Sequence, residues 1–221
     1  CSLDEATAAI ETLARFHAWS WEHPRLTSTP WLQLGVDIVE AAMTQVYPTA
    51  WPRTIELFGD QMTPAIREAI PTLGERGMLL MDRFREGPFT IIHGDYRADN
   101  LLFAPSGEIA VLDWQSPNKS FAAYDIAYFI SGSISKDMMR QHGDRLLRAY
   151  YDAIVAGGVK DYTYDQLHED YVASLLAYLA IFVVSGGTMD TANERGFELF
   201  RLIFERLTAA IMDTDALSML P

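Results

Sequence analysis

Polar groups that could carry out chemistry are concentrated in residues 89–114, the segment FTIIHGDYRADNLLFAPSGEIAVLDW. Asp95, Asn100 and Asp113 all fall within a span of nineteen residues there, beside short apolar runs. Transfer of a γ-phosphoryl group needs a carboxylate that orients or deprotonates the attacking hydroxyl. It also needs hard oxygen ligands that hold magnesium against the phosphates. Asp95 suits the first role, and Asn100 with Asp113 suits the second. The segment therefore predicts a phosphoryl-transfer site that uses ATP and Mg²⁺.

Three short runs rich in β-forming residues must position these side chains. We expect strands at residues 89–92, 101–103 and 109–112, with a turn at Pro105-Ser106-Gly107 between the last two. Asp95 and Asn100 then lie on one loop, and Asp113 ends a neighbouring strand. A hairpin is sufficient to place the three side chains around one cavity.

The pattern HGDYRADN at residues 93–100, followed by LDW at residues 112–114, resembles the loops of a known superfamily. It is similar to the catalytic and metal-binding loops of the aminoglycoside phosphotransferase and choline kinase superfamily, itself similar to protein kinases. The stretch LDWQSPNKSFAAYDIAYFI further resembles ecdysteroid kinase-like and related bacterial phosphotransferases, and LARFHA near the start extends the resemblance. Trp114 and Gln115 stand where protein kinases carry Phe-Gly, which favours a small-molecule kinase. The resemblance implies the C-terminal lobe of a kinase-like fold that phosphorylates a hydroxyl of a small molecule with ATP.

The resemblance also implies roles for neighbouring residues. His93 would support the backbone of the catalytic loop, and Asp125, at the start of the next helix, would brace the same loop. Leu102 resembles the residue that packs under adenine, although an apolar strand residue is usually just part of the core. Two interpretations of Arg97 stay open, because this residue could contact the transferred phosphate or be a solvated loop charge.

Composition limits the partners that we expect. The chain has 221 residues, 49% of them hydrophobic, and a formal net charge of −13, which disfavours nucleic-acid binding. The single cysteine, Cys1, excludes an internal disulfide and fits a reducing cytoplasm. The start of the chain does not resemble a secretory signal, and the longest apolar run, residues 171–184, is shorter than the roughly twenty residues of a bilayer span. We therefore predict a cytoplasmic protein without a membrane segment. An acidic group at residues 161–170 could attract a cationic substrate, but a solvated helix start explains it as well.

The rest of the chain is predicted to be helical. Ser2 with Glu5 forms a capping box, and the helix that follows runs to about Trp19 and buries His17 on its apolar face. Further helices are expected at residues 31–46, at 53–84 as two helices split near Pro71, and at about 123–130, 137–155 and 164–184. A second capping box, Thr191 with Glu194, would open a last helix through Ile211, and residues 214–221 would be frayed. The predicted fold class is α+β and mainly α-helical, with a small β insert that carries both loops.

Kinases of this type also need a glycine-rich cover over the phosphates and a lysine on a preceding strand. The only lysines are Lys119, Lys136 and Lys160, all after the catalytic loop, and no glycine-rich pattern precedes it. We therefore expect residues 1–221 to be the C-terminal lobe of a longer kinase, with a nucleotide-binding lobe in cis. Such a lobe could instead be a non-catalytic binding or scaffold module, and a metal-dependent phosphohydrolase is a weaker third hypothesis. Aminoglycoside, choline-like amine, sugar, steroid and macrolide kinases share these loops, so the acceptor is predicted only as a small-molecule hydroxyl.

Overall fold

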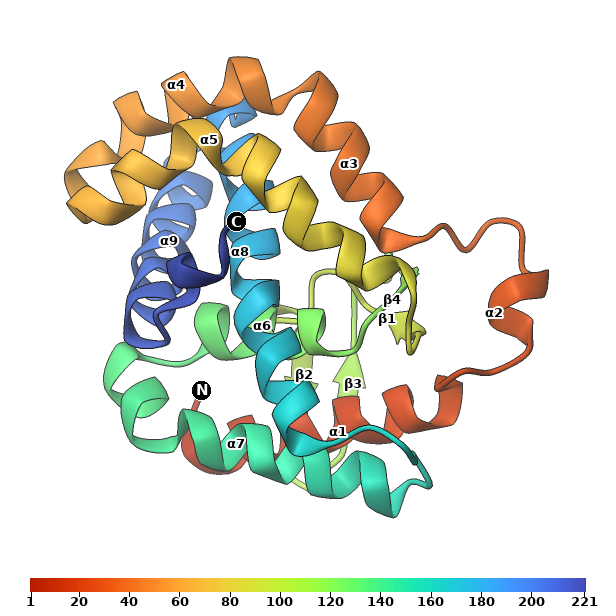
Figure 1. Ribbon diagram of the computed structural model, residues 1–221. Coiled ribbons are helices and arrows are strands. Elements are labelled where there is room, and N and C mark those ends of the chain that lie inside the picture. The colour runs from red at the N-terminus through yellow and green to blue at the C-terminus, as the bar shows by residue number, and fades with distance from the viewer.

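Helix α8 (Tyr164–Thr188) runs through the centre of the protein, whose computed structural model describes all of residues 1–221 (Figure 1). The other long helices are α1 (Leu3–Ser20), α3 (Gly35–Gln45), α4 (Tyr47–Phe58), α5 (Pro64–Met81), α6 (Ala123–Ser133), α7 (Lys136–Ala156) and α9 (Glu194–Asp213). Helices α3, α4 and α5 lie along one side of α8, while α1 and α7 pack on each other at the opposite side. Short helices complete the chain: α2 (Arg25–Ser28) and the 3₁₀ turns η1 (Gly59–Gln61), η2 (Asp82–Arg85), η3 (Ala98–Asn100) and η4 (Ala216–Met219).

Helix α8 is buried on almost every side, which explains its long apolar sequence. Thr163 and Gln166 form a capping box at its start. The helix is long and apolar enough to cross a membrane, but 72% of its apolar window is buried inside the protein. It is therefore the core helix that the sequence predicted.

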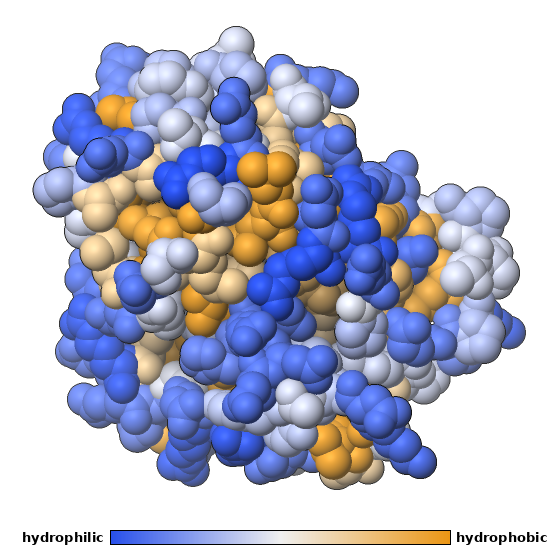
Figure 2. Space-filling view, viewed as in Figure 1, coloured by the Kyte–Doolittle hydropathy of each residue, from blue (hydrophilic) through white to orange (hydrophobic).

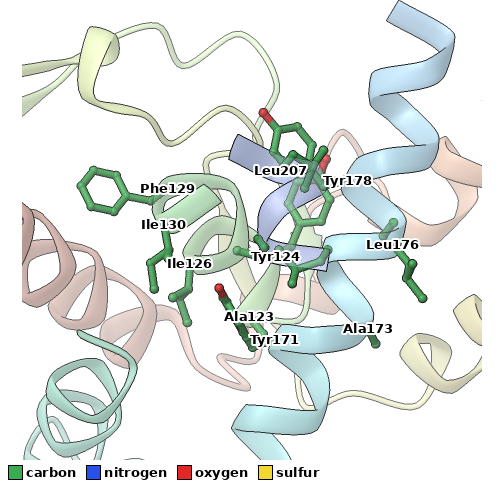
Figure 3. Close-up of a cluster of buried hydrophobic side chains, with 14 of the residues drawn as sticks. Ala123, Tyr124, Ile126, Phe129, Ile130, Tyr171, Ala173, Leu176, Tyr178 and Leu207 are labelled. Atoms are coloured by element: carbon green, nitrogen blue, oxygen red, sulfur yellow. The ribbon is translucent and has the colours of Figure 1, made fainter. Parts of the chain in front are cut away.

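The core is one continuous cluster of 53 buried residues. Figure 3 shows part of it, where Tyr124 of α6 lies near Tyr178 of α8 and Leu207 of α9, while Phe129 points to the other side of α6. Burial of each such large side chain contributes about 1.5–3 kcal/mol. The surface is mostly hydrophilic in the same view as Figure 1, with hydrophobic residues gathered near the middle, over α5, α8 and α9 (Figure 2).

The β insert consists of two separate two-stranded antiparallel sheets. Strand β1 (Thr90–Ile92) pairs with β4 (Asn118–Ser120), and β2 (Leu101–Phe103) pairs with β3 (Ile109–Val111). The three predicted strands and the hairpin are therefore confirmed, as is the mainly helical fold class. Strand β4 was not predicted, because residues 115–120 contain Pro117 and have the composition of a loop.

Some helix ends lie where the sequence predicted them, and others do not. Ser2 and Glu5 form the predicted capping box, and His17 is fully buried in the core. The predicted split near Pro71 is wrong, because α5 continues through Pro71 and the break lies at residues 59–63. Thr63 caps α5 with Pro64 in its first turn, and burial on both sides of Pro71 offsets the lost hydrogen bond.

Two predictions for the C-terminal region are also wrong. The side chain of Asn193 caps α9 by accepting a hydrogen bond from the Gly196 N–H, so Thr191 and Glu194 form no capping box. The last residues are not frayed, because Arg76 donates hydrogen bonds to the carbonyl oxygens of Pro221 (2.8 Å) and Leu220 (3.1 Å). These contacts hold η4 against α5 and α8.

Candidate active site

The loop after β1 turns sharply at Gly94, whose φ is +82°. A Cβ at this position would lie 2.6 Å from the carbonyl oxygen of Ser116. Only glycine fits both the conformation and the space. The loop can therefore fold back over the segment between β3 and β4.

The carboxylate of Asp125, in the first turn of α6, holds this loop in place. It accepts hydrogen bonds from the backbone N–H groups of His93 (2.6 Å) and Gly94 (2.9 Å), and it is fully buried. His17 Nε2 approaches the same carboxylate at 3.4 Å, and His17 Nδ1 lies 2.7 Å from the hydroxyl of Tyr150. Burial and the charge of Asp125 raise the pKa of Tyr150, so the phenol beside His17 stays protonated. Because the Asp125 carboxylate only accepts hydrogen bonds, His17 carries a proton on the Nε2 that faces it.

His93 connects the two loops of the predicted site. Its Nε2 donates to the carbonyl oxygen of Leu112 (2.8 Å), and its Nδ1 accepts from the Asp95 N–H (3.2 Å). Both ring nitrogens are used in this way, and the residue is fully buried. These two contacts leave His93 no free nitrogen for acid–base chemistry, and its supporting role stays a prediction.

Asp95, the predicted base, lies between a cation and an amide. Its Oδ1 lies 3.1 Å from Arg97 Nε, and its Oδ2 accepts from Asn100 Nδ2 at 2.9 Å. The side chains of Asp95 and Arg97 are only 18% and 22% exposed, so Arg97 is not a solvated loop charge. Burial acts to lower the pKa of Arg97, but Asp95 and Asp99 outweigh it and raise the pKa above the usual value.

The two predicted metal ligands both lie at the base of the β2–β3 hairpin. The carbonyl oxygen of Asn100 accepts from the Leu112 N–H (2.8 Å), which places Asn100 opposite the residue before Asp113. The side-chain oxygen of Asn100 accepts no hydrogen bond, because the amide nitrogen makes both contacts with Asp95. Asp113 is exposed and has a left-handed backbone, with φ +62°. Two available oxygen ligands, completed by water and phosphate oxygens, fit the coordination that Mg²⁺ prefers.

Two cavities adjoin the Asp95 loop. One, of about 330 Å³, lies between the loop and helices α6, α8 and α9, and it has Asp95, Arg97, Tyr128 and Tyr178 in its wall. The other, of about 610 Å³, lies between α3, α8 and the β1–β4 sheet. The sequence did not identify Tyr128 and Tyr178 as wall residues, because their spacing is that of a buried helix face. Leu102 lines neither cavity and is 58% exposed on the hairpin.

Comparisons with known proteins give the following matches. The model of the ecdysteroid kinase-like family matches residues 1–164. Acyl-CoA dehydrogenase family member 11 of Homo sapiens and that of Pongo abelii are each 29% identical to this chain over 124 residues. That match covers 55% of this chain and 14% of each relative's own length.

Two solved structures are similar at low identity. Macrolide 2′-phosphotransferase from Brachybacterium faecium has a TM-score of 0.45 and 18% identity, over 89% of this chain and 58% of its own. An ethanolamine kinase of Plasmodium vivax has a TM-score of 0.45 and 14% identity, over 75% of this chain and 48% of its own.

Proposed function

The chain belongs to the ecdysteroid kinase-like family, and from this premise we propose that it transfers the γ-phosphoryl group of ATP to a hydroxyl of a small molecule. The observation that carries the proposal is the position of Asp95. Its carboxylate lies in a cavity wall next to a glycine turn, and both of its oxygens are held by neighbouring side chains. A fixed carboxylate at the edge of a cavity can orient the hydroxyl of a bound acceptor and accept its proton.

Arg97 and Asn100 define the direction of the Asp95 carboxylate. The guanidinium of Arg97 balances its charge in a site that is mostly shielded from water. Because Arg97 also lines the cavity, we propose that it contacts the transferred phosphoryl group as this group approaches the acceptor. Asp125 and His93 act on the reaction only indirectly, because they fix the backbone from which Asp95 projects.

Asn100 and Asp113 would hold magnesium in this proposal. The bound ion would neutralise negative charge on the phosphates of ATP. Leu102 lies on the exposed face of the hairpin that carries Asn100, and we propose that it packs against the adenine. A nucleotide-binding lobe in cis would supply the glycine-rich cover and the lysine that are missing before residue 95.

A coupled assay of ADP formation tests this function. The 221-residue chain would be measured alone and joined to its upstream coding segment, with a panel of small alcohols, with Mg²⁺ or with excess EDTA. We expect acceptor-dependent ADP formation that requires Mg²⁺ and disappears in Asp95→Asn.

Nucleotide binding without turnover on any acceptor would favour the scaffold alternative. Release of phosphate from esters without ATP would favour a phosphohydrolase.

A further inference from the structure

We propose that a second ligand site lies between α7, α8 and α9, and that it binds a small organic ammonium compound with an apolar or aromatic body. The site is a cavity of about 460 Å³, a size within the range of small-molecule pockets. It shares no wall residue with either cavity beside Asp95. It therefore lies outside the part of the molecule that the proposed phosphoryl transfer uses.

The buried tyrosines of the protein fall into two groups. In one group the hydroxyl is hydrogen-bonded within the protein, as it is in Tyr47, Tyr96, Tyr150 and Tyr162. In the other group, Tyr124, Tyr171 and Tyr178, the hydroxyl makes no hydrogen bond, and each residue lines a cavity. Tyr124 and Tyr178 line the two cavities beside Asp95. Tyr171 marks the third cavity in the same way.

The hydroxyl of Tyr171 is available to a ligand. Only 7% of this residue is exposed, and Figure 3 shows its side chain projecting from α8. Asn118 Oδ1 and the Tyr178 hydroxyl are the only side-chain polar atoms that are both unpartnered and sealed from solvent. The Tyr171 hydroxyl is unpartnered but not sealed, so it opens into the cavity that its ring lines. Burial alone raises the pKa of this phenol, with no contribution from a hydrogen bond or a charge. A buried hydroxyl of this kind gains a hydrogen bond when a ligand enters.

Gly143 leaves room on another wall of the cavity. It lies inside α7, where glycine is less favourable than alanine because it loses more backbone freedom on folding. Its φ is not positive, and a Cβ there would meet only the Met139 side chain, at 3.8 Å. Neither the backbone conformation nor close packing therefore requires glycine at this position. The missing side chain keeps the cavity open.

The charges at the rim of the cavity favour a cation. The guanidinium of Arg140 is already paired with Asp213 (2.7 Å), so an incoming anion finds no free guanidinium. Asp144 forms no ion pair, and its side chain accepts a hydrogen bond only from the Tyr164 hydroxyl. One carboxylate of the wall is therefore without a counter-ion. An ammonium group at the rim can bind this carboxylate and remain partly in water.

The end of α9 and the floor of the cavity complete the site. Ala210, Asp213 and Thr214 belong to the last turn and C-cap of α9, where the helix dipole is negative. The floor is apolar, because Met139, Leu147 and the ring of Tyr171 are buried there. A ligand that fits has an ammonium group at the rim, an apolar body on the floor and a hydrogen-bonding group at the Tyr171 hydroxyl.

Binding of four matched probes tests the site. Tyramine carries an ammonium group and a phenol on one short skeleton. Phenethylamine lacks the phenol hydroxyl, 4-ethylphenol lacks the amine, and 3-(4-hydroxyphenyl)propionate carries a carboxylate in place of the ammonium. Affinity for the 221-residue chain would be measured by calorimetry at neutral pH, without ATP or Mg²⁺. We expect tyramine to bind with a Kd of about 1 mM or lower, and at least about fivefold tighter than the propionate.

Two variants assign the contacts to the two ends of the probe. Asp144→Asn should weaken tyramine binding by about three- to fivefold and leave 4-ethylphenol unchanged, since only the ammonium group contacts this side chain. Asp152→Asn is the control, because Asp152 is exposed on the same helix and lies outside the wall. Tyr171→Phe should weaken tyramine binding by about two- to tenfold and leave phenethylamine unchanged, since it removes only the hydroxyl.

A third variant tests the room at Gly143. Gly143→Leu should abolish binding of all four probes, because its side chain fills the space beside Met139. Gly143→Ala is the control, since its methyl group makes only an ordinary contact and favours the helix.

Failure of tyramine to bind, or equal affinity for the propionate, would overturn the second site. Equal weakening of tyramine and phenethylamine by Tyr171→Phe would overturn it too, because it would reveal a general disturbance of the core. Loss of tyramine binding in Tyr178→Phe but not in Tyr171→Phe would place the probe beside Asp95 and also overturn it. Asp144 and Asp152 are both exposed, so their variants fold whatever happens to the core variants. An Asp144→Asn variant with unchanged affinity for tyramine would by itself refute the site.

Discussion

The Asp125 carboxylate accepts a 2.6 Å hydrogen bond from the backbone N–H of His93, thirty-two residues earlier in the chain. The same carboxylate accepts from Gly94, so a single side chain of α6 fixes the turn that presents Asp95. The orientation of the proposed base is therefore set by the helical core.

Replacement of Asp125 tests this brace. Asp125→Ala would leave the buried N–H of His93 and the partly buried N–H of Gly94 without an acceptor, and we expect a loss of about 3 kcal/mol in the free energy of unfolding. Asp99→Ala is the control, because the Asp99 side chain is 60% exposed. Urea unfolding followed by circular dichroism measures both. Equal stabilities of the two variants would show that the brace is unimportant.

Gly94 should tolerate no side chain. Gly94→Ala combines a positive φ with a contact to the Ser116 carbonyl, and we expect it to destabilise the protein by more than about 2 kcal/mol. Gly107→Ala has a similar φ of +87° but no heavy atom within 4 Å of the new Cβ. It should cost only about 1 kcal/mol, the strain of the left-handed backbone. Similar losses of stability in the two variants would contradict the steric argument.

Asp95→Asn should separate turnover from nucleotide binding. In the protein that carries a nucleotide-binding lobe, we expect kcat to fall by about two orders of magnitude or more, because the variant cannot accept the hydroxyl proton. Nucleotide affinity should stay nearly unchanged, since the side chain keeps its size. Steady-state kinetics with a confirmed acceptor provides the measurement, and Asp99→Asn serves as the control. Full activity in Asp95→Asn would exclude Asp95 as the base.

Asp113→Asn should remove the magnesium dependence of nucleotide binding. Asparagine tolerates the left-handed backbone of Asp113, so the change tests the charge with little added strain. Titration with a non-hydrolysable ATP analogue should show a large loss of affinity with Mg²⁺ and little change with EDTA. Asp113→Ala should lose the same dependence and be less stable. Unchanged affinity in the presence of Mg²⁺ would refute the metal-ligand assignment.

Asp170 should give stability a pH dependence. Burial raises the pKa of Asp170 above its usual range, although Tyr162 and Arg83 oppose the shift. The folded protein therefore binds this proton more tightly than the unfolded chain does. The resulting stability is fully present below the unfolded pKa and is lost as pH rises through the folded pKa.

Asp170→Asn should remove that loss. The free energy of unfolding of the variant relative to wild type should increase as the pH rises above about 4, as measured by urea unfolding at each pH. Asp165→Asn, at an exposed position of the same helix, is the control. A stability difference between Asp170→Asn and wild type that is independent of pH would contradict the raised pKa.

The sequence predicted what local patterns can encode. The spacing of Asp95, Asn100 and Asp113 defined the loop and the hairpin, and the Ser2–Glu5 box defined the start of α1. Strand β4 was missed, because its pairing with β1 joins residues about thirty positions apart and three residues carry little β signal of their own.

Other misses have a tertiary cause. Pro71 was read as a helix boundary, but packing on both sides of it keeps α5 continuous. The wall residues Trp31 and Tyr178 belong to different cavities and to distant parts of the chain. A periodic apolar pattern shows that a helix face is covered, but it does not show whether a neighbouring helix or a cavity covers it.

The two walls of the large cavity differ in how freely they can vary. Ile181 and Ala177 belong to α8, the helix on which most of the core packs, so changes there alter folding together with binding. Trp31 and Ile38 lie on the opposite wall and are exposed, so substitutions there should cost the fold little stability. The exposed wall can therefore change in sequence while the wall formed by α8 stays the same. The asymmetry allows the shape of this cavity to evolve in a fold whose centre is nearly fixed.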